Sequence, residues 1–234
     1  MNALNLLSGG AANGLVNRTQ PRFQALTGLS IQGTFSAVGQ MKESLLAGTP
    51  CDLIILSDAL IADLMAAGRL EPGSARPLGV VKTGVCVPQG QAAVDVSDEA
   101  ALARTLAAAQ AIYFPDPVKA TAGIHFMKVL QRLGLDQTMA SRLRVFPNGQ
   151  TAMATMARDA QAGQQGLVGC TQVTEILNTP GVSLCGMLPP GFELLTVYTA
   201  AVVRGAPGAA AARQLIELLT DADNAPVRQA CGFD

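Results

Sequence analysis

Four turns of the sequence combine small residues with a hydroxyl or amide side chain, each where an apolar run gives way to a helical pattern. They are Ser8-Gly9-Gly10, Ser36-Ala37-Val38-Gly39, Thr121-Ala122-Gly123 and Asn148-Gly149-Gln150-Thr151. The first N–H groups of a helix have no partner within it, and the helix dipole favours negative charge there. Such a turn can bind an anion with few charged side chains. Any one of them could equally be an ordinary N-cap, so the predicted anion site depends on the turns lying together.

Other side chains could pair with an anion or react with it. Lys82 and Thr83 lie in the apolar run 79–88, and Lys119 lies in the loop before Thr121. A lysine can pair with a carboxylate, and burial in an apolar strand can lower the pKa of a lysine toward neutrality. Lys82 is therefore the residue that we would test as a proton-transferring base. Lys119 could equally be a solvated loop charge.

Three further polar residues are weaker candidates for the binding site. Tyr198 could add a hydroxyl to the site or be a core residue, and Gln150 could bond a carboxylate or be exposed in the first helical turn. The single histidine, His125, follows Ile124 and precedes Phe126 within a helix. This setting favours a packing or surface role for His125 over acid–base chemistry.

Composition excludes several classes of function. Lys and Arg number 16 against 17 Asp and Glu, which leaves no basic stripe for a nucleic acid. With 49% hydrophobic and 14% charged residues, the chain is predicted to fold rather than stay disordered. Its apolar runs fall short of the roughly 20 residues needed to cross a bilayer, so we expect no membrane insertion. No G-K-[ST] phosphate loop, G-x-S-x-G elbow or metal-ligand spacing is present, and no cofactor is predicted.

Cysteine usage and the first residues bear on the compartment. The five cysteines are an odd number without a C-x-x-C pair, which favours reduced, buried thiols. The opening Met1-Asn2-Ala3-Leu4-Asn5 lacks the basic segment and apolar stretch of an export signal. We therefore expect a cytoplasmic protein as the chain stands, with a periplasmic protein whose leader was removed as the alternative.

Short apolar runs alternate with helical patterns along the whole chain, which predicts an α/β fold of βα units. Strands are expected at 4–7, 29–35, 52–56, 79–88, 111–114, 142–145, 166–170, 182–188 and 192–203. Helices are expected at 13–26, 37–46, 58–67, 99–109, 122–133, 151–162, 172–177, 207–219 and 225–230, the first of them kinked or split at Pro21.

The two long strands suggest a two-lobed chain. Lobe I is predicted to contain residues 1–80 plus 200–234, and lobe II residues 85–193, with crossover hinge strands at about 79–88 and 192–203. This arrangement would gather strand ends and helix starts of both lobes around one cleft, where α/β sheets usually bind ligands.

Motifs spread along the chain resemble the molybdate-binding family of ABC-transporter solute receptors, which has the type 2 periplasmic-binding-protein fold. The resemblance begins with the segment 6–15 and continues with Phe35-Ser36-Ala37-Val38-Gly39. Residues 46–58 are close to the family's A-G-x-P-x-D-L-x-x-x-A-D stretch, and 116–134 and Gly166-Leu167-Val168-Gly169 match later segments. The resemblance implies a small anionic ligand, with an ABC permease as partner if the chain is exported.

The resemblance also implies positions for the binding site. The family's two oxyanion-binding serines would fall at Gly10, near Ser8, and at or next to Gly39, near Ser36. Backbone donors map on Ala122 and near Gly149, and the tyrosine that closes over the oxyanion falls on Gly169. The lost hydroxyls and the missing ring favour a larger carboxylate ligand.

Two functions remain open at this point. The first is a solute-binding protein that closes its lobes over a small oxyanion or carboxylate by hinge motion. The second is an isomerase of a small polycarboxylate, because aconitate isomerase resembles the same family. In that case Lys82 would move the proton while the turns hold the carboxylates.

Overall fold

The computed structural model describes residues 3–234, which divide into two compact units. Unit 1 contains the described residues up to Val81 together with Thr196–Asp234, and unit 2 is Lys82–Leu195. The mixed α/β fold predicted from the sequence is confirmed. The hinge function of the two connecting segments stays a prediction.

Unit 1 is built on a mainly parallel sheet. Its strands are β1 (Ala3–Gly9), β2 (Ser30–Ser36), β3 (Leu53–Ser57) and β9 (Leu195–Val202), in the order β2-β1-β3-β9. Strand β1 is parallel to both neighbours, whereas β9 is antiparallel to β3. The parallel strands all end at one edge, so the turns that follow β1 and β2 lie at the same edge.

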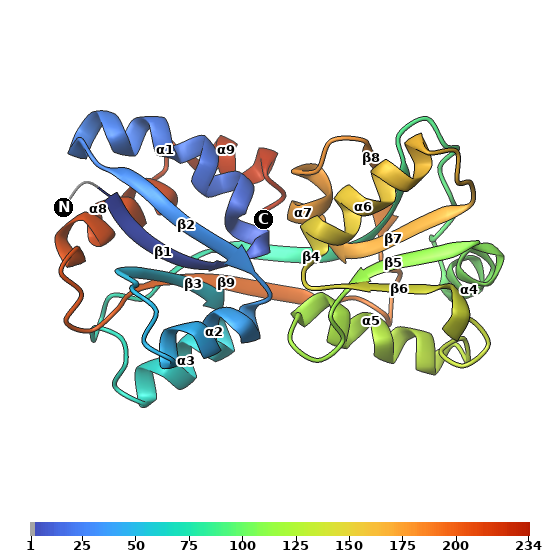
Figure 1. Cartoon of the computed structure of the whole chain (residues 1–234), viewed down its shortest axis with the longest axis horizontal. Helices are drawn as coiled ribbons and strands as arrows, with labels where there is room; N and C mark the ends of the chain where they lie inside the picture. The colour runs from blue at the N-terminus through green and yellow to red at the C-terminus, as the bar shows by residue number, and fades with distance from the viewer. Residues whose placement is uncertain (1–2) are drawn as a thin grey trace. The chain divides into compact units, whose positions relative to one another are not determined.

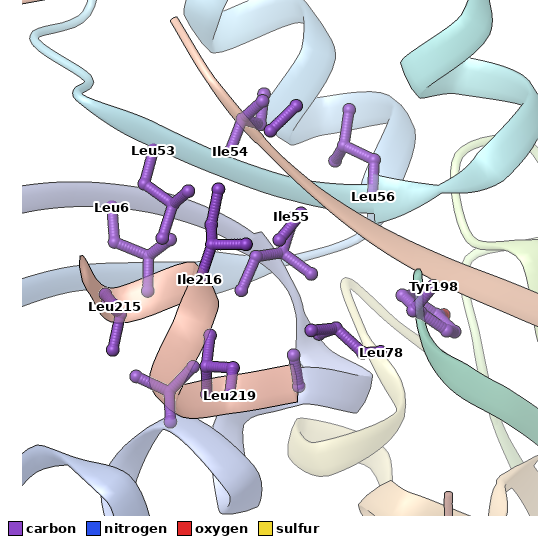
Figure 2. Close-up of a cluster of buried hydrophobic side chains, with 14 of the residues drawn as sticks. Leu6, Leu53, Ile54, Ile55, Leu56, Leu78, Tyr198, Leu215, Ile216 and Leu219 are labelled. Atoms are coloured by element: carbon purple, nitrogen blue, oxygen red, sulfur yellow. The ribbon is translucent and has the colours of Figure 1, made fainter. Parts of the chain in front are cut away.

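Helices cover both faces of this sheet (Figure 1). Helices α1 (Asn13–Thr27), α8 (Ala209–Thr220) and α9 (Ala225–Ala230) lie on one face, and α2 (Val38–Leu46) and α3 (Asp58–Ala66) on the other. Figure 2 shows the alternation on β3: Leu53 and Ile55 point toward Ile216 of α8, whereas Ile54 and Leu56 lie on the opposite side. A strand buried on both faces explains why 53–56 is a continuous apolar run.

Unit 2 repeats this layered plan. Its strands are the part of β4 (Arg76–Pro88) from Lys82 onward, β7 (Leu167–Gln172), β5 (Ala111–Pro115) and β6 (Leu143–Phe146), in that order. Strand β8 (Val182–Met187) also pairs with β4. Helices α4 (Glu99–Ala108) and α5 (Thr121–Arg132) share one core cluster, and α6 (Gly149–Gln161) and α7 (Val173–Leu177) share another. Two 3-10 turns, η1 (Gly10–Ala12) and η2 (Ala140–Arg142), complete the elements of residues 3–234.

Predicted boundaries differ from the structure by up to three residues, and two differences have a visible cause. Helix α1 runs unbroken through Pro21, since its buried face, which includes Leu15 and Phe23, packs in the core while Pro21 is exposed. The last strand starts at Leu195 instead of at 192. Phe192 is held away from the sheet because its carbonyl contacts His125 Nε2 at 2.7 Å and its ring lies 3.9 Å from the Arg132 guanidinium carbon.

No helix within the described part of the chain combines the length and the apolar character needed to cross a membrane.

Candidate functional site

The end of β1 brings two of the predicted turns together in unit 1. Gly9 is the register partner of Ser36 at the end of β2. A Cβ on Gly9 would lie 2.7 Å from Val38 Cγ1, at the start of α2, and 3.0 Å from Tyr198 Cε1 on β9. A residue with a side chain would therefore not fit at position 9. The turns at Gly9 and Val38 therefore lie beside Tyr198, which is 3% exposed and packs in the core of unit 1. A role of these turns in binding an anion stays a prediction.

The serine hydroxyls of these turns are engaged within the chain. Ser8 is fully buried, and its Oγ donates to the Gly9 carbonyl at 2.9 Å. Ser36 Oγ contacts Gln40 Oε1 at 2.8 Å. Gly10 begins η1, and Gly39 is the second residue of α2. An anion at this edge would consequently be bound by backbone N–H groups more than by serine hydroxyls.

Helix α5 provides the corresponding turn in unit 2. The residue before it, Ala120, is extended and has no side-chain acceptor, so Thr121 and the buried Ala122 begin the helix without a side-chain cap from that position. The Asp116 carboxylate accepts the amide of Lys119 at 2.9 Å, and the Lys119 side chain is exposed. A Cβ on Gly123 would lie 2.2 Å from the Asp116 carbonyl oxygen, so this turn packs tightly on the preceding loop.

The fourth turn, at the start of α6, already contains an acidic side chain of the chain, that of Glu175. The Glu175 carboxylate accepts hydrogen bonds from the amides of Gly149 and Gln150, and Thr171 Oγ1 donates to it at 2.5 Å. Burial raises the pKa of Glu175, although these hydrogen bonds act in the opposite direction. The amide of Gly149, the predicted backbone donor to the ligand, binds Glu175. The predicted role of the Gln150 side chain stays a prediction.

Gly169 provides no additional room for a ligand on its core side. We expected the missing tyrosine ring to leave space, but a Cβ on Gly169 would lie 2.7 Å from Met153 Sδ and 2.9 Å from Cys86 Sγ. Both neighbours are fully buried in the core. The space next to Gly169 is therefore filled by sulfur-containing side chains.

The crossing strand β4 carries the two remaining candidates. Lys82 is partly exposed, in contrast to the burial expected for it, whereas Thr83 is 1% exposed. Thr83 is the register partner of Gln172 at the end of β7. Within residues 3–234, neither Thr83 Oγ1 nor Thr174 Oγ1 has a hydrogen-bond partner, although both are buried.

Glu175 and Thr174 are not among the site residues predicted from the sequence. The sequence does contain a signal for them, because the otherwise apolar strand 167–172 ends in two polar residues, Thr171 and Gln172. Thr174 and Glu175 follow within three residues of this strand end. Polar residues at a strand end are also typical of ordinary helix caps, and the sequence alone does not distinguish a binding site from a cap.

Comparison with known sequences gives a match along almost the entire chain. A family model described as bacterial extracellular solute-binding protein matches residues 4–234. Aconitate isomerase from a Pseudomonas species is 25% identical over 236 aligned positions, which cover 98% of this chain and 87% of that protein.

Solved structures share the fold. The periplasmic molybdate-binding protein of Azotobacter vinelandii superposes with a TM-score of 0.80 at 18% identity, covering 99% of this chain and 98% of that one. The sulfate-binding protein SubI from Mycobacterium tuberculosis H37Rv gives a TM-score of 0.72 at 17% identity, with coverage of 100% and 86%.

Proposed function

The chain belongs to the bacterial extracellular solute-binding protein family, and we propose that it binds a small anionic solute through backbone amides at helix starts. The proposal rests on the observation that an alanine precedes both α2 and α5. Ala37 and Ala120 have no side-chain acceptor, so neither can cap the first N–H groups of its helix. Uncapped helix starts attract anions through N–H donors and the helix dipole.

A carboxylate is the solute class that we favour over a tetrahedral oxyanion. The Ser8 and Ser36 hydroxyls contact acceptors of the chain itself, which reduces the donor set for an oxyanion. Lys82 and Lys119 could each pair with a carboxylate group. The similarity to a protein named aconitate isomerase also supports a carboxylate.

Thermal unfolding with citrate, cis-aconitate, trans-aconitate, molybdate, tungstate or sulfate tests this proposal. A solute that binds only the folded chain raises the unfolding midpoint with its concentration. We expect one of the carboxylates to do so. Tight binding of molybdate without any effect of the carboxylates would contradict the carboxylate assignment, and no effect of any solute would contradict anion binding.

Thr121→Pro tests the contribution of the amides at α5. Proline at the first helical position removes one N–H donor with little effect on the helix, and the extended backbone of Ala120 is compatible with a following proline. The matched variant Thr121→Ala removes the hydroxyl and keeps the amide. Weaker binding in Thr121→Pro than in Thr121→Ala would support amide recognition, and equal affinities would contradict it.

An isomerase is the second candidate function, because the similarity to aconitate isomerase extends over 98% of the chain. In this reading the helix starts hold the carboxylates while Lys82 transfers a proton. Isomerisation of aconitate followed by NMR should then be lost in Lys82→Ala and kept in His125→Ala. Unchanged turnover in Lys82→Ala would exclude that residue as the base.

Membership of an extracellular family also favours export over the cytoplasmic location expected from the sequence. For an exported chain we propose an ABC permease as the partner that receives the solute. Cell fractionation tests the location directly.

A further inference from the structure

Two buried hydroxyl groups of unit 2 have no hydrogen-bond partner in the part of the chain that the structure describes. They are Thr83 Oγ1 on β4 and Thr174 Oγ1 at the start of α7, in residues that are 1% and 2% exposed. Buried polar groups in folded proteins are nearly always hydrogen-bonded, because leaving one unpaired destabilises the fold. An unpaired pair of hydroxyls therefore points to a partner outside the chain.

The two threonines lie where β4 pairs with the end of β7, directly before α7. Thr83 is the register partner of Gln172, two residues before Thr174. A Cβ on Gly84 would lie 3.0 Å from Val173 Cγ2, so the residues next to both threonines are in contact. The backbone positions of the two threonines are thus close together in unit 2.

Other buried threonines show that burial alone does not leave a hydroxyl unpaired. Thr171 Oγ1 donates to the Glu175 carboxylate, and Thr179 Oγ1 donates to the Glu175 carbonyl at 2.7 Å. In unit 1, Thr199 Oγ1 donates to Asp58 Oδ1 at 2.9 Å. Thr83 and Thr174 differ from these three in having no acceptor in reach.

We propose that Thr83 and Thr174 determine specificity in unit 2 by donating hydrogen bonds to oxygen atoms of the bound anion. This rests on the proposed function, because the acceptor is an oxygen of that same small solute. A neutral hydroxyl can rotate its proton toward a carboxylate or an oxyanion, and a hydrogen bond to a charged acceptor is stronger than one between neutral groups. A solute without an oxygen at this place leaves both hydroxyls unpaired and is rejected.

Thr→Val variants test the proposal because valine keeps the shape and removes the hydroxyl. The experiment compares Thr83→Val and Thr174→Val with the matched control Thr179→Val, whose hydroxyl is paired within the chain. Calorimetric titration measures the Kd for citrate, the two aconitates, molybdate and sulfate, and thermal unfolding without solute measures stability. Comparing the Kd values for the carboxylates with those for molybdate and sulfate identifies which kind of oxygen the hydroxyls recognise.

We expect Thr83→Val and Thr174→Val each to weaken binding by ~10-fold or more. Without solute, both should unfold at or above the wild-type temperature, because each loses only an unpaired hydroxyl. Thr179→Val should unfold at a lower temperature and keep the wild-type Kd.

Two results would overturn the inference while the proposed function stands. One is a Kd within ~2-fold of the wild type in both variants. The other is a loss of unliganded stability as large as that of Thr179→Val, which would mean that the hydroxyls are paired inside the folded chain. If the wild type binds none of these solutes, the proposed function itself fails, and the inference fails with it.

Discussion

The Glu175 carboxylate lies where a side chain on Gly149 would have to stand: a Cβ at position 149 would be 2.0 Å from Glu175 Oε2. The same Cβ would be 2.0 Å from Thr171 Oγ1. Glycine is therefore required at the start of α6 so that the carboxylate can reach the helix amides. The helix start that resembles an anion site in the sequence is filled by an acid of the chain itself.

Gly149→Ala should destabilise unit 2. The added methyl group displaces Glu175 from its donors, and overpacking together with loss of buried hydrogen bonds should lower the free energy of unfolding by about 2–4 kcal/mol. Urea denaturation measures this value. Thr151→Ala, at an exposed position of the same helical turn, is the control and should stay within about 0.5 kcal/mol of the wild type. A Gly149→Ala protein as stable as the control would contradict this account of the site.

Glu175 should make stability depend on pH. Burial raises its pKa above the ordinary value of 4.5, so the folded state favours the protonated acid. Its contribution to stability is fully present below 4.5 and is lost as the pH rises through the raised pKa of the folded state. The difference in unfolding free energy between wild type and Glu175→Gln should therefore decrease with rising pH across this window.

Urea titrations at several pH values between about 4 and 8 measure that difference. Glu217→Gln, which removes an exposed carboxylate, is the control and should give a flat difference over the same range. A difference that increases with pH for Glu175→Gln would mean that the helix start stabilises the ionised form more than burial disfavours it.

Asp52 should be far more important for stability than a surface aspartate. It is 1% exposed, its Oδ1 accepts the Gly208 amide at 2.9 Å, and its Oδ2 accepts the Asn5 amide at 2.9 Å. Asp52→Asn replaces one accepting carboxylate oxygen by an NH2 group, which faces a backbone N–H donor and cannot accept its hydrogen bond. The substitution should lower the free energy of unfolding by about 2–4 kcal/mol. Asp63→Asn, which breaks an exposed ion pair with Lys42, should cost at most about 1 kcal/mol. Equal effects in urea denaturation would refute this ranking.

The five cysteines should differ in reactivity. All are free thiols; burial raises the pKa of Cys51 to about 12 and also raises the pKa of Cys86, Cys170 and Cys231. The thiolate is the reactive form, so these four should react with an aromatic disulfide reagent only after unfolding. The partly exposed Cys185 should give the fast reaction of the native protein at pH 8. A fast reaction that persists in Cys185→Ser would contradict this assignment.

Much of the fold was predictable because secondary structure follows local patterns. The apolar run at 53–56 and the helical spacing of 99–108 give the strand β3 and the helix α4 without reference to distant residues. The start of β9 was not predictable in the same way. Phe192 belongs to an apolar run, but contacts with His125 and Arg132 on α5 hold it outside the sheet.

The amino-acid sequence by itself determined the order of strands and helices and the four small-residue turns that precede helices. Both follow from local sequence, because hydrophobic periodicity and turn-forming residues can be recognised within a few positions. Only the tertiary structure decided which of these turns contains a group of the chain and which hydroxyls are buried without an acceptor. Glu175 reaches Gly149 from another element, and Thr83 loses contact with water only when β4 packs beside β7. Burial and the choice of hydrogen-bond partner arise from contacts between distant residues, and these exist only in the folded chain.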